Sequence, residues 1–84
     1  MKLEWANSDF FYIVGTPTYI NINEVVQINT RANAWKWQII AYTKQGHRLE
    51  LLDCDSNSEA DKIILEFLRN RPKQGGNGTK ILLQ

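Results

Sequence analysis

Cysteine and histidine are the residue types from which a nucleophile and its general base are often built, and this sequence has one of each. Cys54 stands seven residues after His47, on the same expected strand. At the rise of an extended chain, this spacing separates the two side chains by roughly 20 Å, too far for one to activate the other. No spacing brings paired carboxylates together, and no Gly-rich phosphate loop follows a strand. The sequence therefore predicts that the protein is not an enzyme.

Acidic and amide side chains alternate at the start of the expected helix, as they do in a calcium-binding loop. The series is Asp53, Asp55, Asn57, Glu59 and Asp61. Such a loop needs a glycine near its middle and a bidentate glutamate at its end, whereas Ser58 and Ile64 stand at those positions. Acids at the start of a helix instead complement its dipole. We therefore expect no bound metal and no cofactor.

A basic and aromatic segment covers residues 31–48, with no acidic residue between Glu24 and Glu50. Basic side chains attract phosphate, and aromatic rings on a sheet stack on unpaired bases. The segment therefore predicts an alternative function, the binding of single-stranded RNA or DNA. Its candidate contacts are Arg31, Lys36, Tyr42, Lys44 and Arg48. Against this function, the net charge of the whole chain is only +1, and a basic footprint is the usual sign of nucleic-acid binding.

The composition is that of one small globular domain. The 84 residues are 43% hydrophobic and 23% charged, and the single cysteine excludes a disulfide scaffold. We expect residues 1–71 to form the domain, and the Gly-rich basic residues 72–84 to form a flexible tail whose apolar end, 81–83, could add a strand to a sheet. No apolar run has the length of a signal peptide or a membrane span. We therefore expect a cytoplasmic protein without membrane contacts.

Strand signals dominate the first 55 residues. Short aromatic and β-branched runs predict strands at residues 10–14, 19–22 and 25–28, followed by a polar loop at 29–34. The clearest element is a hairpin over residues 35–53, in which Gly46 supplies the left-handed conformation of a three-residue turn. The turn places Thr43 opposite His47.

This hairpin register separates two faces. It pairs Ala41 with Leu49 and Ile39 with Leu51, and these apolar side chains share a face with both tryptophans of the hairpin. We expect that face to point to the core. The second face mixes polar and apolar side chains: Lys36, Gln38, Ile40, Tyr42, Arg48, Glu50 and Leu52.

A helix is expected at residues 57–70. The S-x-x-E spacing of Ser56 and Glu59 is typical of a capping box, and Pro72 disfavours helix in the residue before it. One apolar stripe follows at helical spacing: Ala60, Ile63, Ile64, Phe67 and Leu68. This stripe is predicted to pack on the sheet through a shared core of Ile20, Ile22, Val26, Ile28, Trp35, Trp37, Ile39, Leu49 and Leu51.

The order of these elements follows a recognisable pattern. It consists of a Y-I-N strand at 19–21, a V-V-x-I strand at 25–28, a Gly-containing hairpin and a Ser-Glu helix start at 58–59. Over about residues 18–70 the chain resembles small bacterial β-meander proteins, among them the flagellar-operon proteins of the FlbD type. The resemblance implies an antiparallel meander with one C-terminal helix, and it supplies no catalytic residue. The chain departs from it in the aromatic strand before Gly15, the longer Trp-bearing hairpin and the tail.

Together these patterns predict an α+β fold: a small antiparallel β-meander of four to five strands with one C-terminal α-helix packed on one face. The function expected of it is that of a non-catalytic binding module, which acts through contacts with another protein or as a homodimer. A strand that is apolar on both faces and the mixed face of the hairpin supply the candidate interface. Its residues are Phe11, Ile13, Ile40, Tyr42, Arg48 and Leu52.

Overall fold

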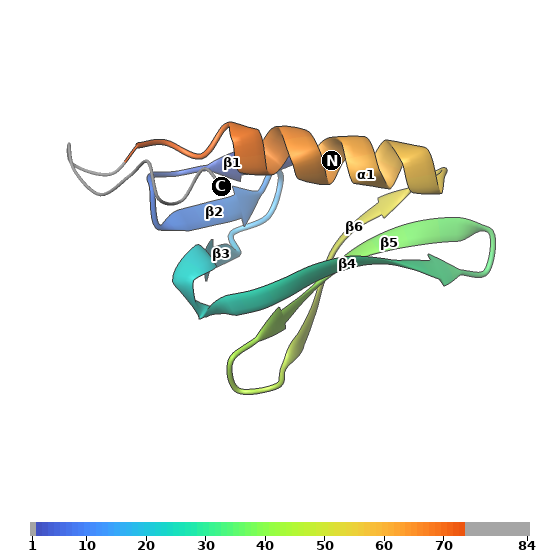
Figure 1. Cartoon of the computed structure of the whole chain (residues 1–84), viewed down its shortest axis with the longest axis horizontal. Coiled ribbons are helices and arrows are strands. Elements are labelled where there is room, and N and C mark those ends of the chain that lie inside the picture. Colours follow the sequence, from blue (N-terminus) through green and yellow to red (C-terminus); the bar gives the residue numbers. More distant parts are fainter. Residues whose placement is uncertain (1, 74–84) are drawn as a thin grey trace.

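The computed structural model describes residues 2–73, which form six strands, a short 3₁₀ helix and one α-helix (Figure 1). The elements are β1 (Leu3–Trp5), β2 (Phe10–Ile13), β3 (Tyr19–Asn21), η1 (Ile22–Glu24), β4 (Val25–Asn33), β5 (Lys36–Thr43), β6 (Arg48–Cys54) and α1 (Asn57–Arg69). The predicted α+β class is confirmed, with six strands in place of four to five. Apart from Pro72 and Lys73, the predicted tail lies outside the described residues, as does its apolar end.

The strands form two antiparallel sheets of three strands each, in the orders β1-β2-β3 and β4-β5-β6. Two parts of this arrangement differ from the expectation. No strand was predicted at residues 3–5, which form β1, and the polar residues 29–34 were expected to form a loop, whereas residues 29–33 continue β4. Pairing with β5 holds this polar stretch in the sheet, because the ladder satisfies backbone groups whatever the side chains are.

The predicted hairpin between β5 and β6 is confirmed at its turn. Thr43 N donates to the carbonyl oxygen of His47 at 2.9 Å, and Gly46 has a φ of 89°, in the region that favours glycine. Ala41 pairs with Leu49 as expected. Further along, the register shifts by one residue, because β6 carries an extra residue, Leu51, between the partners of the two β5 isoleucines. Ile39 therefore pairs with Leu52 and not with Leu51.

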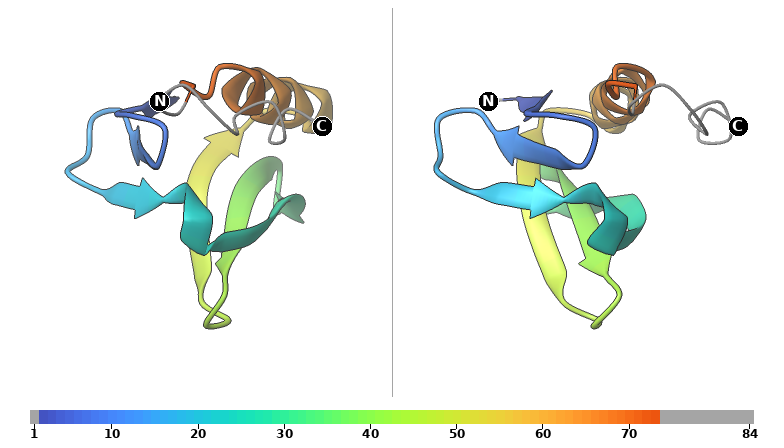
Figure 2. Two further views of the ribbon diagram at one scale, coloured as in Figure 1. Left: turned by 60° about the vertical axis from the view of Figure 1, so that its left-hand side comes forward. Right: turned by 90° about the vertical axis from the view of Figure 1, so that its left-hand side faces the viewer.

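The helix begins as the sequence predicts. Ser56 is its N-cap and accepts a hydrogen bond from Glu59 N at 3.1 Å. The reciprocal bond differs by one residue from that of a standard capping box, because the Glu59 carboxylate accepts from Asp55 N at 2.9 Å. α1 lies across one side of the β4–β6 sheet and reaches the β1–β3 sheet at its C-terminal end (Figures 1 and 2).

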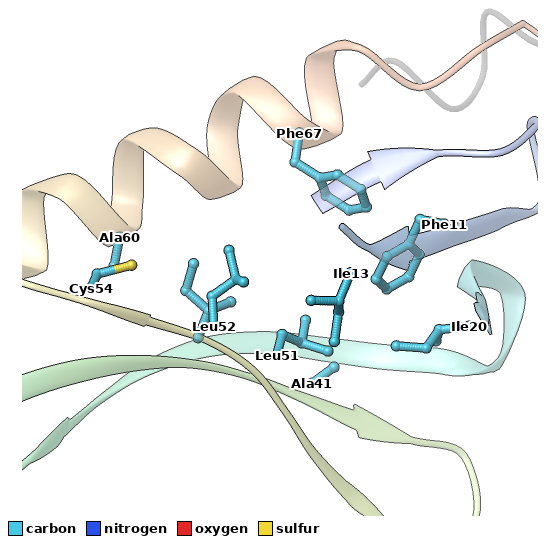
Figure 3. Close-up of a cluster of buried hydrophobic side chains, with 10 residues drawn as sticks. Phe11, Ile13, Ile20, Ala41, Leu51, Leu52, Cys54, Ala60 and Phe67 are labelled. Carbon is cyan, nitrogen blue, oxygen red and sulfur yellow. The ribbon is translucent and has the colours of Figure 1, made fainter. Parts of the chain in front are cut away.

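The core lies where the helix and the two sheets meet (Figure 3). Its buried members are Phe11, Ile13, Ile20, Ile39, Ala41, Leu51, Leu52, Cys54, Ala60 and Phe67. Three residues predicted to belong to it are instead exposed: Val26, Trp35 and Leu68. Val26 is displaced by a register shift at the start of β4, and Trp35 lies in the turn between β4 and β5.

Aromatic rings join the β1–β3 sheet to the helix. Trp5 of β1 stacks on Phe67 of α1, with ring centroids 4.4 Å apart and planes 4° from parallel. Phe11 contacts both rings edge to face. Trp5 Nε1 also donates to the carbonyl oxygen of Phe67 at 2.7 Å. Arg71, next to the helix end, donates from Nε to the carbonyl oxygen of Ser8 at 2.8 Å. This junction holds the β1–β3 sheet against the C-terminal end of α1.

Candidate interaction surfaces

The two residues with the chemistry of a catalytic pair lie at opposite ends of β6 and differ in environment. Cys54 is buried at the end of β6 beside the helix, and burial raises the pKa of its thiol. His47 is exposed, just after the β5–β6 turn. A buried thiol with a raised pKa is a poor nucleophile. Among residues 2–73, no group of His, Cys, Asp and Glu side chains is placed to hold a metal ion.

Four of the six residues predicted to form an exposed interface are buried, so that expectation is wrong for them. Phe11 and Ile13 face the core from β2, because only the alternate residues of that strand point outward. Leu52 is turned to the core by the extra residue in β6. Ile40 lies on the other side of the central strand, between Asn29 and Glu50, and is only 1% exposed.

The other two predicted interface residues, Tyr42 and Arg48, pair with each other across β5 and β6. They share the face of the β4–β6 sheet that lies opposite the helix, which we call the outer face. The same register places Arg31 and Lys36 on this face, so four of the five predicted nucleic-acid contacts share it. Lys44 lies apart from them, in the turn.

The outer face also contains acids that offset these basic groups. Glu50 and Asp53 of β6 pair with Ile40 and Gln38 of the central strand, and they therefore lie on the same side. Arg48 forms an ion pair with Glu50 at 3.3 Å. Gln38 donates from Nε2 to Glu50 at 3.5 Å. Three basic and two acidic side chains therefore share this face, which leaves it only weakly positive.

Trp35 is the most exposed large apolar side chain of the described residues, with 88% of its surface accessible. It follows Ala34, whose φ of 57° lies in the left-handed region. Residues other than glycine, asparagine and aspartate rarely adopt that conformation. The sequence pattern predicted a core tryptophan, because two-residue alternation places it on the same face as Trp37. A turn at Ala34 and Trp35 breaks this alternation.

The outer edge of β4 is unpaired among the described residues. β4 is nine residues long and lies at the margin of its sheet, with β5 as its only described partner (Figure 1). A groove of about 330 Å³ runs between this edge and α1. Ile28, Ile64 and Leu65 contribute its apolar part, and Leu65 is 59% exposed. No sequence signal singled out this edge, because residues 29–34 were expected to form a loop.

Another groove, of about 500 Å³, lies between β1 and the C-terminal half of α1. Lys2 and Glu4 border it, and their side chains form an ion pair at 3.1 Å. Tyr12 donates to Glu4 Oε1 at 3.1 Å. The hydrogen bonds that Glu4 accepts from Lys2 and Tyr12 lower the pKa of its carboxyl group. The hydrogen bond to Glu4 in turn raises the pKa of the Tyr12 hydroxyl. Lys2, Glu4 and Tyr12 therefore satisfy one another at this sheet edge.

None of the helices in residues 2–73 combines the length and hydropathy required to cross a lipid bilayer. Comparisons with protein-family models, with curated proteins and with solved structures find no match to this chain. The resemblance to the FlbD type therefore stays a prediction. The β4 edge and the outer face are the two surfaces of residues 2–73 that bring several candidate residues together.

Proposed function

We propose that this protein is a small non-catalytic binding module that acts through protein–protein contacts. The observation that carries the proposal is the edge of β4, which has no partner strand among residues 2–73 and has exposed apolar side chains at both ends and beside its middle. Val26 at its start, Trp35 just beyond its end and Leu65 beside its middle are 62%, 88% and 59% exposed. Single exposed apolar residues are ordinary, whereas a long strand edge without a partner is a template on which another strand can pair.

The backbone of β4 adds a second source of affinity to these side chains. An unpaired strand edge offers a row of amide and carbonyl groups, and an extended partner strand can satisfy them. The apolar groove beside the edge then gains contacts from the partner's side chains. Strand pairing supplies affinity in this mode, and the side-chain contacts supply selectivity.

The test uses the tagged full chain to retrieve proteins from cell extract, with and without nuclease, at moderate and high salt. We expect a discrete protein complex, or self-association of the chain, that survives nuclease and weakens little with salt, because apolar contacts respond weakly to ionic strength. The double variant Trp35→Ser and Leu65→Ser should lose the complex. Tyr19→Ser is the matched control, since Tyr19 is as exposed as Leu65 and lies on the other sheet. Equal retention by both variants would contradict the proposal.

Binding of single-stranded nucleic acid is the second candidate, favoured by the register that aligns Arg31, Lys36 and Tyr42 on the outer face. It is tested by fluorescence anisotropy with a labelled single-stranded oligonucleotide at increasing salt. This candidate requires an affinity that falls steeply with salt and falls again in the variant Arg31→Gln and Lys36→Gln. Binding that is absent, or is the same in wild type and variant, excludes it.

A further inference from the structure

The free edge of β4 has a definite hydrogen-bonding pattern, which follows from the β5–β6 turn. Thr43 and His47 are a hydrogen-bonded pair, since Thr43 N donates to His47 O. Backbone groups of successive residues point to opposite sides of a strand, so β5 residues of the same parity as Thr43 face β6 and the others face β4. Through the observed register, Gln27, Asn29 and Arg31 of β4 then bond to β5. The backbone groups left on the free edge belong to Ile28, Thr30 and Ala32.

The side chains of β4 do little to keep another strand away. Natural edge strands are usually short, or carry lysine, proline or several charges that oppose pairing. β4 has no proline, and Arg31 is its one charged residue. The register shift at Val26 disturbs only the first part of the strand, which leaves seven regular residues, 27–33, available for pairing.

We propose, resting on the proposed function, that the partner on this edge is a second copy of the chain. The two β4 strands pair antiparallel about a two-fold axis at Thr30, the middle residue of the regular stretch, and join the two β4–β6 sheets into one. This register is the one that overlaps residues 27–33 of both copies completely. It also brings together only backbone groups that the monomer leaves on the free edge, since Ile28 of one copy lies opposite Ala32 of the other.

Side chains of the two copies are compatible in this register. Arg31 lies opposite Asn29 of the second copy, so the two cationic groups are not placed face to face, and an amide oxygen stands opposite each guanidinium. In this register, the β4–β5 turn of each copy extends past the paired residues and reaches the first residues of β4 in the other copy. Trp35 of one copy is thereby brought near Val26 of the other, and these are the two most exposed large apolar residues of the described chain.

The first experiment is thiol cross-linking with the full chain. In an antiparallel hydrogen-bonded pair the Cα atoms are about 5.5 Å apart, and the Cβ atoms are farther apart than the roughly 4 Å of a disulfide. A short bifunctional thiol reagent spans this gap, so it should rapidly cross-link Thr30→Cys into a covalent dimer. Thr18→Cys is the matched control, because Thr18 is exposed and lies before β3, away from β4. Native Cys54 does not compete, since it is buried in the core.

The second experiment is sedimentation equilibrium of the wild type and two variants. Ala32→Pro removes an amide that has no partner strand among residues 2–73, so the fold should survive while pairing is lost, as circular dichroism would verify. Trp35→Ser changes a side chain that is 88% exposed and should weaken the dimer at unchanged melting temperature. It serves as the test if Ala32→Pro does not fold.

A wild-type dimer that both variants weaken, with cross-linking at Thr30→Cys alone, supports the proposal. A monomeric wild type overturns it, and retrieval of a different protein by that monomer would leave the proposed function intact. A dimer that keeps its affinity in both variants and cross-links no faster at residue 30 than at residue 18 also overturns it, because the copies would then meet through another surface.

Discussion

β1 and β4 are both edge strands, yet the protein treats them in opposite ways. β1 is three residues long, carries the Lys2–Glu4 ion pair beside it and is tied to α1 through Trp5. β4 is nine residues long, has a single charge and is followed by a tryptophan that contacts solvent. The first edge has the features that oppose strand pairing and the second lacks them. The open edge is therefore a property of β4 itself. It does not follow from the small size of the protein, because the β1 edge of the same protein has features that oppose pairing.

The same contrast appears in the two tryptophans next to these edges. Trp5 stacks on Phe67 and its ring nitrogen is hydrogen-bonded, whereas Trp35 is almost fully exposed. Aromatic side chains bury large areas when they belong to a core. We therefore expect the residues around β1 to determine stability and those around β4 to determine binding. Substitutions on the two sides test that division, and the largest effect is expected at the β1 side.

Phe67→Ala should have the largest effect. It removes the ring that stacks on Trp5 and contacts Phe11, and truncation of a buried phenylalanine typically costs about 3–5 kcal/mol. The free energy of unfolding, measured by urea denaturation, should fall by that amount, which is enough to unfold a domain of this size. Leu68→Ala is the control, because Leu68 is exposed on the neighbouring position of α1. Equal midpoints for the two variants would show that the junction does not hold the domain together.

Trp5→Phe should lower the free energy of unfolding by about 1–2 kcal/mol, since it keeps an aromatic ring but removes the donor to the Phe67 carbonyl. Trp35→Phe should change it by less than about 0.5 kcal/mol, because no core contact is lost. Denaturation of the two variants side by side compares the two edges directly. A larger loss for Trp35→Phe would reverse the assignment of stability to the β1 side.

Ala34→Gly should raise stability slightly. The φ of Ala34 is 57°, and a residue with a side chain in that region costs roughly 1 kcal/mol relative to glycine. Part of this gain is offset by the greater freedom of glycine in the unfolded chain. Ala34→Val, which cannot adopt this conformation easily, should instead lower the thermal midpoint. Opposite shifts of the two variants would confirm that the β4–β5 turn stores backbone strain.

The smallest effect concerns pH and the β1 edge. Hydrogen bonds from Lys2 and Tyr12 lower the pKa of Glu4 below its ordinary value of 4.5. The ionised carboxylate is thus favoured in the folded state, so its contribution is present above pH 4.5 and is lost as the pH falls through the lower folded pKa. Glu4→Gln should remove a small part of the acid sensitivity of unfolding. An NMR titration of Glu4 that gave a pKa at or above 4.5 would contradict this account.

Local sequence determined several parts of this protein. Gly46 permits the left-handed residue of its turn, and Ser56 and Glu59 satisfy exposed amides at the helix start, because each of these features depends on residues a few positions apart. The α+β class follows from them and from the change of apolar period at the helix. The mixed face of the hairpin was also predictable near the turn, where Tyr42 and Arg48 pair as expected.

The tertiary structure decided which residues face solvent. The extra residue in β6, Leu51, orients Leu52 toward the core. The β4–β5 turn at Trp35 leaves the Trp35 ring outside the core. Arg71, expected at the boundary of a basic tail, instead bonds to the carbonyl of Ser8 across the fold. These outcomes depend on strand pairing and on packing between distant segments. A one-residue shift in strand register moves the side chains of that strand to the opposite face of the sheet. Which residues form the candidate binding surface was therefore settled by long-range contacts that no local pattern encodes.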